Sequence, residues 1–146
     1  MQLKRKPKIT EEEIKKEEYR KRGKKSRNKG ANFERAIAKK FKEFFGIDLV
    51  RTPQSGGFAK KSVKADEFRG DIVSADADHE LMLHVECKNA QSWSLPKWLQ
   101  QAEGDCPKDK KPCVVMHKPN SSQDYIVLKL EDFFKLTSKD KVFKEK

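Results

Sequence analysis

The stretch GDIVSADADHELMLHVECK, residues 70–88, holds two short apolar runs separated by a polar segment. Runs of this length and composition predict two strands, at 70–75 and 81–88, which the DADHE segment joins as an antiparallel hairpin. Side chains alternate between the faces of a strand, so Glu86 and Lys88 project together from the second one. That face carries Met82, His84, Glu86 and Lys88, whereas the other carries Leu81, Leu83, Val85 and Cys87. The hairpin therefore predicts a charged pair on an otherwise apolar strand.

Asp71 opens the first strand, and the hairpin brings it near the level of Glu86 and Lys88. Carboxylates at that range raise one another's pKa unless a cation joins them. Hard oxygen ligands with open water positions suit Mg²⁺, and Mn²⁺ is expected to substitute for it. The hairpin therefore predicts a magnesium site.

A third carboxylate comes from the segment before the hairpin. Large apolar residues recur with a helical period and predict a helix over 31–46 that ends at Gly46; they are Phe33, Ile37, Phe41, Phe44 and Phe45. Glu34 is expected in the first turn, bordering this stripe and directed at the sheet edge. Three carboxylates and Lys88 suit phosphodiester hydrolysis, in which Lys88 stabilises or helps deprotonate the attacking water.

The remaining apolar runs complete one domain. Strands are expected at 47–52, 113–118 and 125–130, and helices at 94–104 and 131–136. The order α-β-β-β-α-β-β indicates an α/β or α+β layer fold around a five-stranded sheet. A basic arm at 1–25 precedes this domain at 26–138, and a charged tail follows at 139–146. Within the arm, Thr10 and Glu13 have the spacing of a capping box.

Composition narrows the classes of partner. The 146 residues carry a formal net charge of +11, and residues 1–30 alone hold 13 basic and 5 acidic side chains. A basic protein of this kind most often meets nucleic acid, so a membrane or a small-molecule substrate is not expected. The sequence has no long apolar run, no signal-peptide pattern and three cysteines, which favours a cytoplasmic rather than a secreted protein.

Simpler interpretations exist for each motif. Glu86 and Lys88 could form an ordinary surface ion pair, and Glu34 could be a favourable charge at a helix N-terminus. Cys106, Cys113 and His117 lack the spacing of a compact zinc site. Cys113 is more simply a residue of the strand core, and Trp98 is more simply a core residue than a base-stacking one.

Together the motifs resemble the PD-(D/E)xK nuclease superfamily, and within it the archaeal-type Holliday junction resolvases and their phage-borne relatives. The resemblance covers about residues 26–130 and rests on RNKGANFERAIAKKF, VRTPQSGGF, FRGDIV, LHVECKN and WLQQAEG. The proline of the superfamily name is absent, because Arg69 and Gly70 precede Asp71. The basic segment 58–68 departs from the shortest family members and leaves the substrate preference open.

The resemblance implies a restriction-endonuclease-like core with a mixed sheet and a homodimer that cuts branched DNA as a crossover junction endodeoxyribonuclease. Such a protein acts in DNA recombination and repair and is cellular or virus-encoded. Glu34, Asp71 and Glu86 would surround the metal, with Lys88 beside them. Ser55 would assist at the scissile phosphate, and Gln101 would face the site from the next helix. The expected DNA contacts are Arg27, Lys29, Arg51, Lys60 and Lys61. The alternatives are a phage or mobile-element nuclease for other replication or repair structures, and a non-catalytic DNA-binding module.

Overall fold

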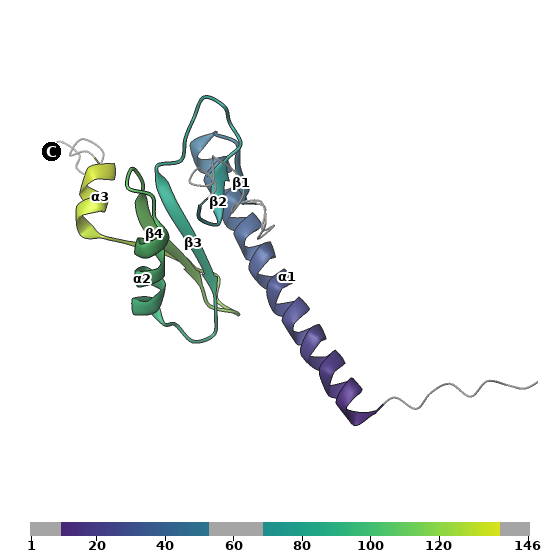
Figure 1. Cartoon of the computed structure of the whole chain (residues 1–146). Coiled ribbons are helices and arrows are strands. Elements are labelled where there is room, and N and C mark those ends of the chain that lie inside the picture. The colour runs from purple at the N-terminus through teal and green to yellow at the C-terminus, as the bar shows by residue number, and fades with distance from the viewer. Residues whose placement is uncertain (1–9, 53–68, 138–146) are drawn as a thin grey trace, which may run out of the picture.

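The structure is a computed structural model that describes residues 10–52 and 69–137 (Figure 1). Three helices and five strands follow one another along the chain in the expected succession. They are α1 (Glu11–Phe45), β1 (Leu49–Arg51), β2 (Ile72–Ser74), β3 (Leu83–Asn89), α2 (Leu95–Asp105), β4 (Lys111–His117), β5 (Asp124–Leu128) and α3 (Leu130–Leu136). Among the described helices, none is long and apolar enough to cross a membrane.

Helix α1 is much longer than the helix expected at 31–46, because it begins within the basic arm. Its 35 residues correspond to about 52 Å. Thr10 and Glu13 form the expected capping box, and Gly46 closes the helix in the left-handed region with φ 71°. The first part of α1 extends beyond the rest of the molecule (Figure 1). Glu34 consequently lies deep within a continuous helix rather than in a first turn.

The strands form two sheets where a single five-stranded sheet was expected. The smaller sheet pairs β1 with β2 antiparallel, so that Val50 faces Val73. The larger sheet has the order β3-β4-β5, with β3 and β4 parallel and β4 and β5 antiparallel. The expected mixed pairing is present in the larger sheet, but the hairpin between 70–75 and 81–88 is wrong, because the first of these strands pairs with β1.

The reason for the two sheets lies in the backbone around Asp71. The carbonyl oxygen of Asp71 accepts from the Thr52 N–H at 2.9 Å, which extends the pairing of β2 with β1. Beside β3, the Asp71 N–H donates to the Val85 carbonyl at 2.7 Å, and the Asp71 carboxylate accepts from the Cys87 N–H at 2.7 Å. A side chain thus takes the place of a main-chain acceptor, and Asp71 links the two sheets.

Both faces of the larger sheet are covered by a helix. Helix α1 packs on the face that carries Val85, Cys113 and Val115, and contributes Phe33 and Ile37 to that core. Helix α2 packs on the other face, where Ala102, Val114 and Met116 are buried with Trp98 and Leu99 against them. Cys113 is fully buried, which confirms its interpretation as a residue of the strand core, whereas Trp98 is half-buried and packs against the second core.

Candidate active site

Strand β3 is an edge strand of the larger sheet, and its alternation places the candidate side chains. Leu83, Val85 and Cys87 pack into the core beneath α1, as expected. Glu86 and Lys88 lie on the opposite face and reach Gln101 of α2. The site is therefore built where an apolar strand turns a charged face toward a helix.

Gln101 connects the two charged residues of β3. Its side-chain oxygen accepts from the Lys88 ammonium at 2.9 Å, and its amide nitrogen donates to Glu86 at 3.4 Å. The Lys88 nitrogen lies 3.2 Å from a Glu86 oxygen, and the two side chains are 21% and 10% exposed. An ordinary surface pair is far more open to water than this, so the simpler interpretation of Glu86 and Lys88 does not fit.

Asp71 reaches the open edge of β3 because the backbone turns at Gly70. Gly70 adopts φ 90°, and a Cβ there would come within 3.2 Å of the Val85 carbonyl oxygen. The Thr52 hydroxyl donates to the Gly70 carbonyl at 2.8 Å and holds the turn from the other side. Glycine suits the position before Asp71 because φ 90° disfavours a side chain and a Cβ would be tight against β3.

Glu34 is buried on α1, 7% exposed, and accepts from Nε of Arg51 on β1. Helix α1 begins at Glu11, so Glu34 lies far beyond the first turn, in which a helix dipole favours an acid. The interpretation of Glu34 as a favourable charge at a helix N-terminus is therefore wrong. Arg51, for which the resemblance implies a DNA contact, pairs with this carboxylate in the structure.

The three carboxylates share one electrostatic environment. Burial raises the pKa of Asp71 to about 7; the Cys87 N–H opposes that rise, and the charges of Glu86 and Glu34 add to it. The pKa of the buried Asp71 is raised further by two neighbouring acids, and Lys88 only partly opposes this rise, so the site lacks compensating positive charge. The donor chemistry therefore fits a hard divalent cation.

The three carboxylates do not yet converge on one point. Within the described residues, no three His, Cys, Asp or Glu side chains are grouped closely enough to hold a metal ion. Each acid instead has another partner. Glu34 meets Arg51, Asp71 meets the Cys87 N–H, and Glu86 meets Lys88 and Gln101. Binding one ion through all three would compete with these contacts.

His84 is a neighbour of this site that sequence reasoning did not include. It is 1% exposed, and its Nε2 lies 3.7 Å from a Glu86 oxygen. Burial is the main cause that lowers the pKa of His84, whereas the carboxylates of Glu86 and Asp105 oppose that change. Strand alternation placed His84 and Glu86 on one face, so the signal was present in the sequence.

The other expected site residues are divided between exposed and undescribed positions. Arg27 is exposed, Lys29 is exposed, and both lie on α1 where it leaves the body of the molecule. Ser55, Lys60 and Lys61 lie outside the described residues. Cys106, Cys113 and His117 form no metal site in the described part of the chain.

A comparison with known families agrees with this arrangement. The family described as "Phage putative PDDEXK endonuclease" matches residues 25–146. No curated protein and no solved structure matches the chain. The family match places the chain in the PD-(D/E)xK class of proteins. The chain belongs to this phage PDDEXK endonuclease family, whose superfamily generally uses divalent metals and acts on DNA.

Proposed function

We propose that the protein is a Mg²⁺-dependent, structure-selective endodeoxyribonuclease that hydrolyses phosphodiester bonds in branched DNA, in the manner of a Holliday junction resolvase. The observation that carries this proposal is that the Asp71 carboxylate is bonded to the Cys87 N–H, between the Glu86 and Lys88 pair along β3, where the charges of Glu86, Glu34 and Lys88 all act on its pKa. Membership of a phage endonuclease family supports the class of reaction.

Each side chain has a distinct role in the proposal. Glu34, Asp71 and Glu86 would hold the divalent cation, which supplies Lewis-acid polarisation of the phosphate and a water of lowered pKa. Lys88 would donate a hydrogen bond to the attacking water, or its charge would stabilise the negative charge that develops on the phosphate. Gln101 is a positioning residue, because its two ends bind Lys88 and Glu86 and fix their separation. Ser55 remains the candidate for contact with the scissile phosphate.

A four-way junction has two-fold symmetry and needs two cuts, so we propose that the active form is a homodimer with two sites. The phosphate contacts proposed from the resemblance are Arg27, Lys29, Arg51, Lys60 and Lys61. For Arg51 the role requires a change of partner, because its Nε now donates to Glu34. Metal binding by Glu34 would release Arg51 for a phosphate.

The family also favours a second candidate within the same chemistry. Its phage origin fits a nuclease that cuts other replication or repair structures. The two candidates differ in one test: cleavage of a synthetic four-way junction beside a linear duplex of the same sequence, in Mg²⁺ and in EDTA. Selective cutting of the junction supports a resolvase. Cutting of both substrates supports the second candidate, and binding without cutting in Mg²⁺ supports a non-catalytic DNA-binding module.

A further inference from the structure

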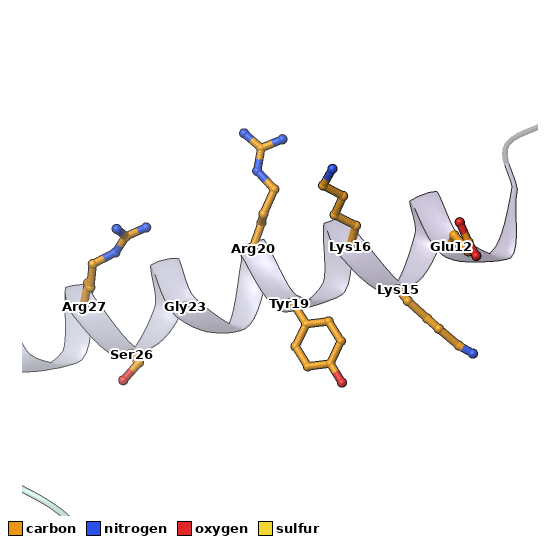
Figure 2. A pocket seen from close by; sticks show the side chains of 8 residues that line it. All are labelled: Glu12, Lys15, Lys16, Tyr19, Arg20, Gly23, Ser26 and Arg27. Atoms are coloured by element: carbon orange, nitrogen blue, oxygen red, sulfur yellow. The ribbon is translucent and has the colours of Figure 1, made fainter.

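The exposed half of α1 continues the side of the helix that carries Glu34. An α-helix turns about 100° per residue, so positions 16, 20, 23, 27, 30 and 34 fall within an arc of about 80°. Their residues, called here the α1 row, are Lys16, Arg20, Gly23, Arg27, Gly30 and Glu34. Figure 2 shows the side chains of Lys16, Arg20 and Arg27 leaving the helix on one side, with those of Tyr19 and Ser26 on the other.

The cations of the α1 row have few acidic partners within the described part of the protein: the charge of Arg20 lowers the pKa of Glu17, which is already paired with Lys21. Lys16, Arg20 and Arg27 form no salt bridge there, whereas Lys21, on another side of the helix, lies 2.9 Å from Glu17. The three basic residues line a shallow hollow that runs along α1. Glu12 is the one acid among the residues that line this hollow, so its basic side chains, aligned over three turns, outnumber the acid and are suited to an anionic polymer.

The two glycines of the row have no packing explanation. A Cβ at Gly23 would meet nothing within 4 Å, and one at Gly30 would meet only a Glu34 oxygen, at 3.8 Å. Glycine is nevertheless unfavourable inside a helix, so its presence twice on one side calls for another reason. Between the basic residues, the glycines leave the helix surface open to close approach by another backbone.

We infer that the α1 row binds the sugar–phosphate backbone of one DNA strand and leads it to the candidate active site. This inference rests on the proposed function, since it places the scissile phosphate beyond Glu34. Lys16 and Glu34 are five helical turns apart, or about 27 Å. That length equals the rise of about eight base pairs along the axis of a duplex, at 3.4 Å each. An acidic protein segment is the other anionic polymer that could bind these cations. DNA is favoured over it because the row ends at Glu34 of the candidate nuclease site.

The test compares two triple variants of the full-length protein that lose the same charge. One is Lys16→Ala/Arg20→Ala/Arg27→Ala, in the row. The other is Lys21→Ala/Arg22→Ala/Lys25→Ala, on the opposite side of α1. Affinity for a long linear duplex is measured in EDTA over a range of salt concentrations, with circular dichroism to compare helix content.

The row variant is expected to lose about 2.7 from the slope of log affinity against log salt, or 0.9 for each phosphate contact. Its affinity at moderate salt should fall at least about tenfold, while the opposite-side variant changes far less. Equal losses in both variants, or no loss in the row variant, overturn the inference. Cleavage by the wild type in Mg²⁺ is scored separately, so the proposed function can stand while this inference fails.

Discussion

Lys88 is the residue whose role is most easily separated from folding. Its ammonium is held by Gln101 and Glu86, and in the proposed mechanism it acts on the attacking water or the phosphate. Lys88→Ala should lower DNA cleavage at least about a hundredfold, the scale for loss of a preorganised electrostatic or acid–base group. Lys97→Ala removes the same charge from an exposed position of α2 and should cut normally. Single-turnover rates measure both, and equal rates would reduce Lys88 to an ion-pair partner.

Gly70 is the residue on which the geometry of Asp71 depends. Gly70→Ala places a Cβ 3.2 Å from the Val85 carbonyl oxygen, in a backbone conformation with φ 90° that disfavours side chains. We expect a loss of about 1–3 kcal/mol in the free energy of unfolding. Gly104→Ala is the matched control, because its Cβ would meet nothing within 4 Å and α2 should be slightly stabilised. Urea denaturation distinguishes the two, and a stable Gly70→Ala protein would show that the turn tolerates a side chain.

At the scale of elements, one polar network ties α1 to the edge of the larger sheet. Asp124 of β5 binds Lys40 of α1, and its other oxygen lies 2.8 Å from Nδ1 of His117 on β4. Burial alone would raise the pKa of Asp124, but the bonds from Lys40 and His117 outweigh it and hold this pKa below its usual value.

A lowered folded-state pKa means that Asp124 stabilises the fold above its unfolded pKa of about 3.9. That contribution is lost as the pH falls through the lower folded value. Asp124→Asn should therefore be less stable than the wild type at neutral pH and should lose less stability on acidification below about pH 4. Thermal melts across this range provide the measurement, and parallel curves for the two proteins would contradict the role of the network.

The N-terminal half of α1 is an element that the fold does not need. Residues 11–25 are exposed throughout, so they bury little apolar surface. Deleting residues 1–25 removes 11 basic side chains and should leave the thermal midpoint nearly unchanged while DNA affinity falls. Calorimetry and binding titrations check the two halves of this prediction. A large drop in the midpoint would show that the extension contributes to the core.

Local patterns predicted the elements well and their pairing less well. Alternation along 81–88 and helical spacing over 33–41 depend on neighbours in sequence, and both appear as expected. Phe44 and Phe45, expected on the same apolar stripe, are exposed at the end of α1. The pairing of β2 was not predicted. At Asp71 the side-chain carboxylate, rather than a main-chain carbonyl, accepts the hydrogen bond from the Cys87 N–H, and no periodicity in the sequence encodes such a contact. For the same reason the sequence identified Glu34 and Arg51 separately but not their ion pair, which joins α1 to β1.

At the scale of the whole molecule, binding and cutting should have different requirements. The basic extension of α1 contacts DNA in our account, whereas hydrolysis depends on the small cluster at β3. Ca²⁺ should therefore support DNA binding with little cleavage, because its longer and looser coordination misplaces the attacking water. Parallel binding and cleavage assays in Ca²⁺ and Mg²⁺ measure this. Equal cleavage rates in the two ions would contradict the proposed metal-dependent chemistry.

The central claim is that the carboxylate of Glu86 serves phosphodiester hydrolysis. The most direct measurement is the single-turnover cleavage of a four-way junction in Mg²⁺ by wild-type and Glu86→Gln proteins of equal fold and comparable DNA affinity. The glutamine keeps the shape of the side chain but removes a charge that would hold the metal. We predict that cleavage falls at least about a hundredfold while binding persists or tightens. A folded Glu86→Gln protein that cuts at the wild-type rate would contradict the assignment of this site.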